Sequence, residues 1–364
     1  MLSSLAAKLQ QSLSLLQKQD IQTASQALGV GAQWASSKVL LGDDCAAIPD
    51  GDGYLLLAAE GILPQFLETE PWFAGWSAVM VNVSDIYAMG GRPIAVVDTL
   101  WSQSSSSTNS IWDGMKAAAQ AYNVPIVGGH TNCHSPYNAL SVAILGRAKR
   151  LITSFNAQPG DLLLVATDFR GKSHPKYPFW DAATTADPVQ LRENLAILPY
   201  LAETGLCDAG KDISNGGIIG TLLMLLETSG CGAVLNLDQV PCPEELALER
   251  WLISFPSYGF LLSVRPDNAS AVQSYFHQQS LVCEVVGEVQ PTQQLVLQSA
   301  LAYPSRRAAP KGFFKEVRSS ADAPNVATDS LSLSQQESIV FWDLSQQKLT
   351  GFSTDCGEES PLRA

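Results

Sequence analysis

Residues 76–89 constrain the fold more than any other segment, because they have helical periodicity and carry apolar side chains on almost every face of the expected helix. A helix of this composition is mostly buried in a protein interior. Asn82 and Asp85 lie three positions apart and therefore share one face of that helix. Buried polar groups need a partner, and a metal ion, a phosphate or a helix cap would each satisfy this pair. A functional and a structural role are both open for it.

Apolar runs and amphipathic segments alternate on both sides of this helix, which is typical of a mixed α/β protein. Gly90 and Gly91 end the helix, and Pro93 follows them. Residues 102–110 are rich in serine and form a polar loop. In this first part of the chain we expect helices over residues 3–28, 76–89 and 110–122, and strands over residues 38–41, 54–59, 94–100, 124–127 and 139–147.

A turn-forming stretch at residues 156–161 separates this part from a second one with the same alternation. There we expect strands over residues 162–167, 233–237, 258–264 and 282–288, and helices over residues 187–202, 218–229, 243–253 and 267–278. The simplest interpretation is a first α/β domain over residues 1–150 and a second over residues 151–300. Residues 301–364 form an appended segment, which a short strand at residues 339–342 would dock.

The charge balance excludes two classes of partner. The chain has 364 residues, with 22 Lys and Arg against 35 Asp and Glu, which gives a formal net charge of −13. Nucleic-acid backbones and anionic membrane surfaces both attract basic proteins, so we expect neither as a partner. No apolar run reaches the length of about 20 residues that a membrane helix needs. Seven scattered cysteines without a paired spacing favour a reducing cytoplasm.

Acidic residues follow two of the expected strands in the first part. Asp43 and Asp44 come directly after the strand at residues 38–41, and Glu60 ends the strand at residues 54–59. Carboxylates at the end of a strand are suitable ligands for a hard cation such as Mg²⁺, which often bridges to phosphate. The alternative for the sequence Gly42-Asp43-Asp44 is an ordinary turn.

A glycine pair marks a further candidate site. Gly128 and Gly129 follow a short expected strand and precede His130, and they would let a ligand approach the backbone closely. His130 could instead belong to a zinc site with Cys133 and His134.

The second glycine pair, Gly216 and Gly217, precedes the helix expected at residues 218–229, and the N-terminus of a helix is a site for anions. Ser214 or Asn215 could equally act as an ordinary N-cap there. Four residues after the strand at residues 162–167 could bind an anionic substrate or form a solvated loop, and they are Arg170, Lys172, His174 and Lys176.

The order of these motifs is more informative than any one of them. The series runs from Gly42-Asp43-Asp44 through a strand that ends in an acid to Asn82-x-x-Asp85-x-x-x-Met89-Gly90-x-x-Pro93, Gly128-Gly129 and Asp212-Ile-Ser-Asn-Gly-Gly217. It resembles the superfamily of aminoimidazole ribonucleotide synthetase over roughly residues 25–290. Thiamine-monophosphate kinase, selenophosphate synthetase and the hydrogenase-maturation carbamoyl dehydratase are other members. The first part is most similar to the kinase, and the whole chain to the branch of synthetase-related proteins.

The resemblance implies a two-domain, mixed α/β fold of the PurM-like type, in which four-stranded sheets from the first domains of two subunits pair into a barrel-like homodimer. It also implies ATP and two or more Mg²⁺ ions as cofactors. The implied reaction is phosphoryl transfer involving a small molecule, by a kinase or by a synthetase with a phosphorylated intermediate. By position, the metal ligands would be Asp43, Asp44, Glu60 and Asp85, the catalytic acids Asp85 and Asp212, and the other cofactor-binding residues Asn82, Gly128, Gly129, His130, Gly216 and Gly217.

Three positions depart from the pattern of the kinase-like members. Glu60 and His130 stand where those members have aspartate, and Tyr258-Gly259-Phe260 stands where an acid-rich segment is expected. Histidine is a poor ligand for Mg²⁺, so one metal would be lost, would be replaced by Mn²⁺, or would give way to a direct bond between His130 and phosphate. Thiamine phosphate is therefore not supported as the substrate. The alternative function is a non-catalytic nucleotide-binding or partner protein with a degenerate metal site.

Overall fold

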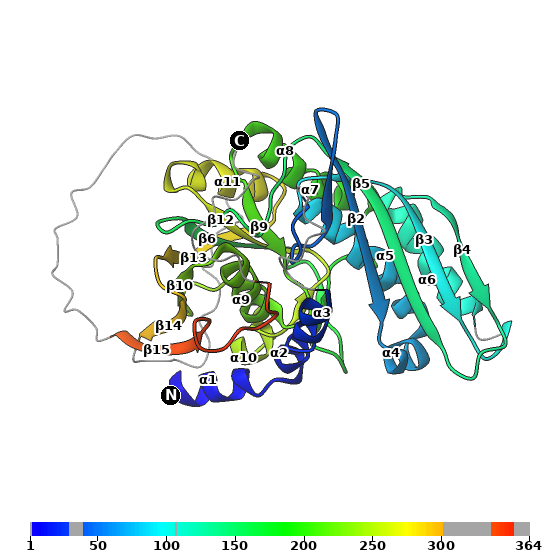
Figure 1. Ribbon diagram of the computed structural model, residues 1–364, viewed down its shortest axis with the longest axis horizontal. Coiled ribbons are helices and arrows are strands. Elements are labelled where there is room, and N and C mark those ends of the chain that lie inside the picture. Colours follow the sequence, from blue (N-terminus) through cyan, green and yellow to red (C-terminus); the bar gives the residue numbers. More distant parts are fainter. Residues whose placement is uncertain (1, 29–38, 106–107, 301–335, 353–364) are drawn as a thin grey trace.

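The computed structural model describes residues 2–28, 39–105, 108–300 and 336–352 of the chain. Two sheets with helices on their faces form two adjoining parts, which is the mixed α/β architecture that the sequence predicts (Figure 1). The central helix α5 (Pro71–Ala88) lies between them and contacts strands of both sheets. One cluster of buried apolar side chains includes α5 and the near sides of both parts, so the hydrophobic core is continuous. None of the described helices is both long and apolar enough to cross a membrane.

The first sheet has five strands in the order β1-β2-β5-β3-β4, one more than the four that the resemblance implies. They are β1 (Ala46–Asp50), β2 (Gly53–Ile62), β3 (Arg92–Trp101), β4 (Ile126–Asn132) and β5 (Ala139–Ala148). β3 and β4 run parallel because α6 (Asn109–Tyr122) crosses between them, whereas the other neighbours are antiparallel. α5 and α6 pack against each other behind this sheet, and α4 (Pro64–Thr69) precedes α5 (Figure 1). The additional strand, β1, forms a hairpin with β2 in which Gly51 has a φ of +64°.

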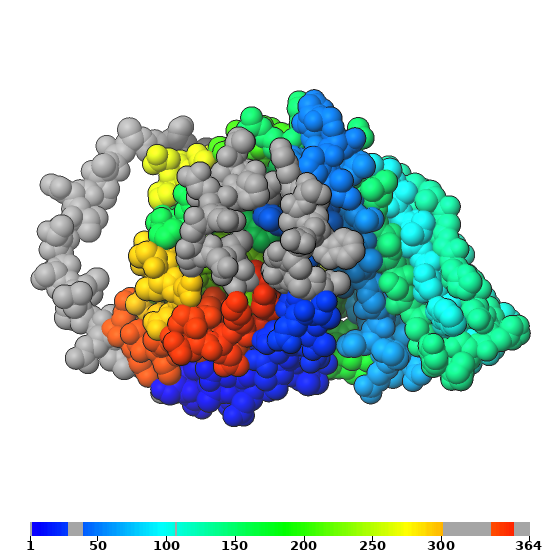
Figure 2. Space-filling model, in the orientation of Figure 1, coloured from blue at the N-terminus to red at the C-terminus, as the bar shows by residue number. Residues whose placement is uncertain are grey.

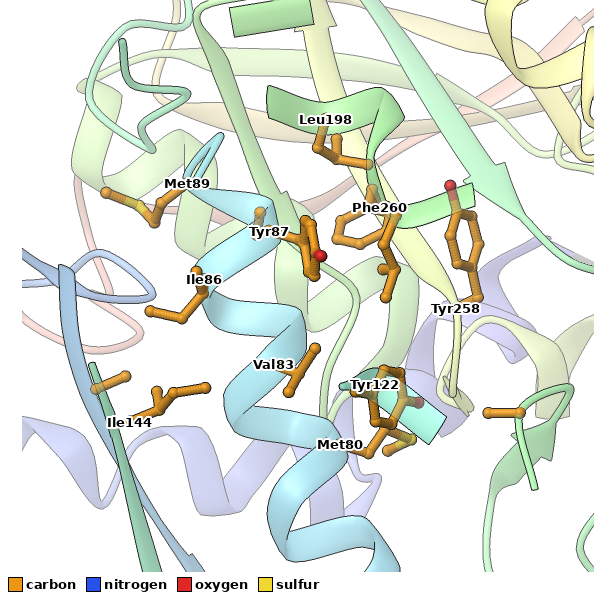
Figure 3. Packing of buried hydrophobic residues seen from close by; sticks show 14 of the residues in the cluster. Met80, Val83, Ile86, Tyr87, Met89, Tyr122, Ile144, Leu198, Tyr258 and Phe260 are labelled. Atoms are coloured by element: carbon orange, nitrogen blue, oxygen red, sulfur yellow. The ribbon is translucent and has the colours of Figure 1, made fainter. Parts of the chain in front are cut away.

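The predicted burial of the central helix is confirmed. Six of its apolar side chains have no exposed surface, namely Ala74, Ala78, Val79, Met80, Val83 and Ile86. Figure 3 shows the helix between Ile144 of β5 and Phe260 of the second part. The helix begins at Pro71 rather than at residue 76, since proline is favoured in the first turn. It ends as predicted, before Gly90 with a φ of +72°.

The second sheet has seven strands in the order β15-β14-β10-β13-β6-β12-β9. They are β6 (Leu162–Thr167), β9 (Ala209–Asp212), β10 (Gly232–Asn236), β12 (Gly259–Val264), β13 (Val282–Gln290), β14 (Gln294–Ala300) and β15 (Gln336–Asp343). Successive residues of β6 point to opposite faces, so Leu164 belongs to the core around α5 and Leu163 to the core around α9 (Gly217–Ser229). α8 (Ile197–Thr204) and α11 (Pro266–Gln278) contribute to the first of these cores.

A small three-stranded sheet and two short helices complete the second part. They are β7 (Lys172–Ser173), β8 (Phe179–Asp181), β11 (Phe255–Pro256), α7 (Pro188–Leu195) and α10 (Leu248–Trp251).

Both ends of the described chain lie against the second sheet (Figure 1). The N-terminal helices are α1 (Leu2–Gln10), α2 (Leu13–Lys18) and α3 (Ile21–Leu28). α1 contacts β14 and β15, and α2 contacts α9. β15 confirms the strand predicted at residues 339–342, and it pairs antiparallel with β14. The segment predicted as the first domain, residues 1–150, thus begins with helices that contact the second sheet.

Several predicted boundaries are wrong for local reasons. The helix expected over residues 3–28 is divided into three, and Ser12 between the first two is extended, with a ψ of 132°. Residues 39–41 form no strand, and residue 38 lies outside the described residues. The strand of this region is β1, which follows the two aspartates instead of preceding them. The helix expected over residues 187–202 is divided at Ala196, and the one expected over residues 243–253 is reduced to the four residues of α10. β9 and β14 have no counterpart among the predicted elements.

Candidate active site

Asp43 and Asp44 lie in the loop before β1 and face Lys211 of β9, so this site joins the two parts of the molecule. The ammonium nitrogen of Lys211 is 2.5 Å from Oδ1 of Asp44 and 3.7 Å from Oδ1 of Asp43. All three side chains are buried. Burial alone would lower the pKa of Lys211, but the charges of Asp44 and Asp43 outweigh it and raise the pKa. Lys211 is absent from the predicted site residues, although a lysine directly before Asp212 in an apolar region was a usable signal.

The carboxylate of Asp43 is fully engaged. Its Oδ2 accepts hydrogen bonds from the hydroxyl of Thr153 and, at 2.9 Å, from the amide of Ser154. Its Oδ1 accepts a bond of 3.0 Å from the amide of Asp44. These bonds fasten the loop before β1 to the chain that leads into the second sheet. Asp44, rather than Asp43, is the aspartate of the pair whose charge acts on the carboxyl groups of the other predicted acids.

The two polar residues of α5 are buried and only partly satisfied. Asn82 has no exposed surface, and its Nδ2 donates to the carbonyl of Ala78 at 2.8 Å. Oδ1 of Asn82 and Oδ2 of Asp85 have no hydrogen-bond partner among the residues that the structure describes. A buried acceptor without a partner costs about 1–3 kcal/mol. Neither residue caps a helix, because both lie inside α5. Of the partners considered from the sequence, a cation or a phosphate is therefore left.

Asp44, Glu60, Asp85 and Asp212 act on one another electrostatically, although they come from four separate segments. Burial raises the pKa of Asp85 well above its ordinary value, and Asp212, Glu60 and Asp44 add to this. Burial also raises the pKa of Asp212, with Asp44 the largest contributor after it. Glu60 is exposed and lies within β2 rather than at its end as predicted. Loss of solvation around its carboxyl group raises its pKa, the charge of Lys18 opposes this, and the charge of Asp44 adds to it. The amide of Asp212 donates a hydrogen bond of 3.2 Å to Oδ2 of Asp44, and the charges of all four carboxyl groups affect one another. We call these four residues the acid cluster.

A second lysine, Lys18 at the end of α2, belongs to the same region and is also absent from the predicted residues. Its ammonium group donates to the hydroxyl of Ser214 at 3.3 Å. Burial lowers its pKa, and the charges of Asp212 and Glu60 oppose that effect. No local spacing relates residue 18 to residue 214, so the sequence alone offered no signal for this contact.

The glycine loop before α9 has the backbone conformation that its composition requires. Gly216 and Gly217 have φ values of +97° and +62°, and a Cβ on Gly217 would lie 2.5 Å from the backbone of Ile253. Gly216 is the N-cap residue, so the alternative in which Ser214 or Asn215 caps α9 is wrong. Two early amides of this helix already have partners, since Gly217 donates to Ser214 and Ile219 donates to Leu252. The N-terminus of α9 therefore offers an anion fewer free donors than an open helix end.

The other glycine pair lies apart from the acid cluster. Gly128, Gly129 and His130 are exposed residues within β4, an edge strand, and not after a strand as predicted. β3 and β5 lie between β4 and the strand of Glu60, a separation of three strand spacings of about 4.8 Å each. A Cβ on Gly129 would lie 2.5 Å from Oδ1 of the buried Asp98, so this glycine makes room for a carboxyl group that is absent from the predicted site residues.

The acid cluster has the donor type for Mg²⁺ without being a complete site. No three His, Cys, Asp or Glu side chains within the described ranges are grouped so that they could hold a metal ion by themselves. The zinc alternative with His130, Cys133 and His134 is therefore not supported. Mg²⁺ usually takes one or two carboxylates and completes its coordination with water and substrate phosphates. A cation that arrives with a nucleotide fits these carboxylates, and the unpartnered oxygen of Asp85 is a ready ligand for it.

Three of the four basic residues after β6 have other partners. Arg170 forms an ion pair of 2.7 Å with the buried Asp168. Lys176 forms an ion pair of 3.2 Å with Glu70. The ring of His174 stacks on Phe73 with 5.4 Å between the ring centroids. The last two contacts join the second part to the region around the start of α5. This loop therefore has a structural explanation, and it does not by itself identify an anionic substrate.

Comparison with known proteins gives the family. The family model for the AIR synthase related protein, N-terminal domain, matches residues 42–148, and the one for the C-terminal domain matches residues 158–299. The chain belongs to the AIR synthase related family. The resemblance inferred from the order of the motifs is thus confirmed. α1 to α3 and β15 lie outside both matched ranges.

Relatives of known sequence and structure agree with this placement. The uncharacterized protein sll0787 of Synechocystis is 52% identical over 98% of this chain and 100% of that protein. Thiamine-monophosphate kinase of Pyrococcus horikoshii is 29% identical over 57% of this chain and 69% of the kinase. The structure of AaThiL complexed with AMPPCP and TMP matches with a TM-score of 0.59 at 21% identity, over 74% of this chain and 92% of that one.

The structure of Thermotoga maritima PurL complexed with ATP matches with a TM-score of 0.58 at 22% identity. The match covers 73% of this chain but 44% of the PurL chain, so this protein spans less than half the length of that relative. These two solved structures confirm the PurM-like fold, and at such identities they establish the fold alone.

Proposed function

We propose that this protein binds ATP with Mg²⁺ and transfers the terminal phosphoryl group to a small molecule, as a kinase or as a synthetase with a phosphorylated intermediate. The observation that carries the proposal is the buried Oδ2 of Asp85, which has no hydrogen-bond partner in the described part of the chain and lies among three other acids. Carboxyl groups held together despite their mutual repulsion are typical of functional sites. The solved complexes of AaThiL with AMPPCP and of PurL with ATP support ATP as the nucleotide.

The residues of the site have different roles in the proposed reaction. One or two of Asp85, Glu60 and Asp44 would hold the cation together with the nucleotide phosphates, and the cation would supply charge neutralisation for the triphosphate. Lys211 offsets the charge of the loop before β1 and keeps that loop against the second sheet. Asp212 faces the same cluster from β9, and we assign it the orientation of the phosphoryl acceptor. Phosphoryl transfer needs mainly such positioning and charge stabilisation from a protein.

The acceptor differs from thiamine phosphate in this proposal. Tyr258 and Phe260, which stand where the kinase-like members have an acid-rich segment, are buried in the core around α5 (Figure 3). Both side chains pack in the core, and neither can replace the carboxylates that the kinase-like members have in this segment. A cytoplasmic location is part of the proposal, because the seven cysteines are scattered without a paired spacing.

A second candidate function is nucleotide binding without transfer. It is favoured by His130, which occupies a position where the kinase-like members have an acid and which lies on an edge strand away from the acid cluster. The predicted nucleotide contacts of Gly128, Gly129 and His130 remain predictions under both candidates.

A homodimer is the proposed assembly. The face of the first sheet that points away from α5 exposes apolar side chains, including Leu57 at 48%, Val97 at 42% and Leu145 at 37%. Leu57 and Leu145 are directly opposite each other on β2 and β5, so they form one patch. An apolar sheet face of this kind is typical of a protein interface, and pairing with a second copy of the chain would cover it.

The test is thermal unfolding of the full chain with ATP, Mg²⁺ or both. We expect both together to raise the melting temperature, since a ligand at 100 times its Kd stabilises by about 2.7 kcal/mol. Asp212→Asn should keep that shift but lose acceptor-dependent release of ADP, whereas the exposed control Glu244→Gln should keep both. An unchanged melting curve with Mg²⁺ and ATP would refute the proposal. Nucleotide binding without acceptor-dependent turnover in any tested acceptor class would favour the second candidate.

A further inference from the structure

The two lysines near the acid cluster differ in how much of their charge is already neutralised. Lys211 is buried in direct contact with Asp44 and Asp43. Lys18 is half-buried, and its hydrogen bond is to the neutral hydroxyl of Ser214. No ion pair involving Lys18 occurs within residues 2–28, 39–105, 108–300 and 336–352 at a nitrogen–oxygen distance of 4.0 Å or less. An ammonium group has three donors, so Lys18 has donors left for a ligand.

Local packing places the Lys18 side chain over the glycine loop. Leu15, one turn earlier on α2, is 1% exposed and lies against α9, where its Cδ1 is 3.8 Å from the position of a Cβ on Gly220. Nδ2 of Asn215 donates to Oε1 of Gln17 at 3.4 Å. A Cβ on Gly216 would lie 3.8 Å from Cε of Lys18, so the lysine stem crosses the loop where no side chain obstructs it. α2 is thus seated on the loop that connects Asp212 to α9.

Residues 348–352, which we call the C-terminal segment, hold α3 and α9 in place through hydrogen bonds. Nε2 of Gln22 on α3 donates to the carbonyls of Lys348 and Leu349, at 2.8 and 3.0 Å. The buried carboxylate of Glu227 on α9 accepts bonds from the amides of residues 349, 350 and 351 and from the hydroxyl of Thr350, at 2.6 to 3.1 Å. Figure 2 shows the N-terminal helices in dark blue and the C-terminal segment in orange-red side by side on one surface.

The same C-terminal segment also reaches the loop that carries the aspartates. A Cβ on Gly42 would lie 2.6 Å from Cβ of Phe352, so the two residues are in close contact. The N-terminal helices and β15 with the residues after it, none of which the two family models match, therefore form one unit beside the acid cluster. Within this unit, the ammonium group of Lys18 reaches the loop after Asp212 through its bond to Ser214, and the charges of Asp212, Glu60 and Asp44 act to raise its pKa.

We propose that Lys18 binds the terminal phosphate of the nucleotide, and that the unit formed by the two ends of the chain exists to position it there. The inference rests on the proposed function and adds to it a residue contributed from outside both matched domains. A cation held by the carboxylates and an ammonium group on the opposite side would contact different oxygens of one phosphate. The charge on the transferred phosphoryl group would then be stabilised from two directions, which is the form of catalysis that phosphoryl transfer uses.

A purely structural role for Lys18 makes a different prediction about nucleotides. A lysine that only anchors α2 through Ser214 would affect ATP and ADP binding alike, because it would act through the position of the helix. A lysine that contacts the terminal phosphate would affect ATP far more than ADP.

The experiment measures the Kd of Mg-ATP and of Mg-ADP by calorimetry on the full chain. We expect Lys18→Met to weaken Mg-ATP binding by about tenfold or more, the effect of one lost charge-assisted contact, while Mg-ADP changes by less than about threefold. Lys18→Arg should stay within about threefold of the wild type for both, since it keeps the charge. Lys8→Met is the matched control, because Lys8 lies on α1 of the same unit and pairs with Glu249 at the surface.

A second measurement works on the unaltered protein, in case Lys18→Met does not fold. Acylation of lysines followed by mass spectrometry should show that Mg-ATP protects Lys18 and leaves Lys8 reactive. Unchanged Mg-ATP affinity in Lys18→Met, equal losses for ATP and ADP, or no protection of Lys18 would each overturn the inference while the proposed function stands. A wild type that binds no Mg-ATP would instead refute the proposed function, and this inference with it.

Discussion

Replacing Asp85 by asparagine should stabilise the metal-free protein and remove its response to Mg-ATP. In the wild type, Oδ2 of Asp85 is buried and has no hydrogen-bond partner among the described residues, and the residue is 6% exposed. A buried unpartnered acceptor costs about 1–3 kcal/mol, and a carboxylate costs more than an amide. Because asparagine has nearly the same shape and no charge, we expect a gain of about 1–3 kcal/mol in the free energy of unfolding at neutral pH.

The gain should depend on pH in a defined direction. Burial, with Asp212, Glu60 and Asp44 adding to it, raises the pKa of Asp85 well above that of an aspartate in an unfolded chain, which is about 3.9. The folded protein therefore holds this proton over a pH range in which the unfolded chain has lost it. The stability that this proton contributes is complete below the unfolded pKa and is lost as the pH rises through the folded pKa. The difference between Asp85→Asn and wild type should thus be small near pH 4 and grow toward pH 8.

The assay is urea unfolding of both proteins in a chelator at several pH values, followed by thermal unfolding with Mg-ATP. Asp113→Asn is the matched control, because Asp113 lies on the exposed side of α6 and pairs only with Lys116 at the surface within the described structure. An exposed pair of this kind is worth less than about 0.5 kcal/mol. A destabilised Asp85→Asn, or a difference from wild type that does not change with pH, would refute the reasoning. So would an Asp85→Asn protein that keeps the full melting shift with Mg-ATP.

Two further predictions concern the ends of the chain and its assembly. Glu227→Ala should destabilise the protein by about 2–4 kcal/mol and open residues 336–352 to limited proteolysis, because the buried donors of residues 349–351 lose their acceptor. Glu249→Ala, which removes a surface ion pair with α1, should leave the cleavage rate near that of wild type. Leu145→Glu should convert the proposed dimer to monomers in analytical ultracentrifugation, since it buries a charge in the apolar patch, whereas Val189→Glu on the exposed side of α7 should not. A Leu145→Glu protein with the mass of the wild-type dimer would show that subunits associate through another face.

The sequence pattern alone predicted two of the elements that are buried along most of their length. The helix around Asn82 and Asp85 was predictable because a segment that is apolar on all faces is mostly buried, and the two polar residues within it stood out for the same reason. The strand at residues 162–167 was predicted with its observed bounds, because a short apolar run bounded by turn-forming residues is typical of a buried strand. The order of the glycine and acid motifs gave the family before any contact was known.

Elements that depend on pairing with distant strands were missed. β9 has only four residues and β14 has seven, and each pairs with a strand far along the chain. The strand placed before Asp43 and Asp44 lies after them, because the hairpin of β1 with β2 determines the pairing there.

The sequence by itself determined which residue types this site contains, namely several acids, glycine loops and one buried helix that carries two polar groups. Only the tertiary structure decided what each acid does. It ties Asp43 to Thr153 and Ser154, and it leaves Oδ2 of Asp85 without a partner in the described structure. It also brings Lys18 to a loop almost 200 positions away. The physical reason is that local periodicity sets which side chains are buried, whereas the partner of a buried charge depends on how separate sheets and helices meet.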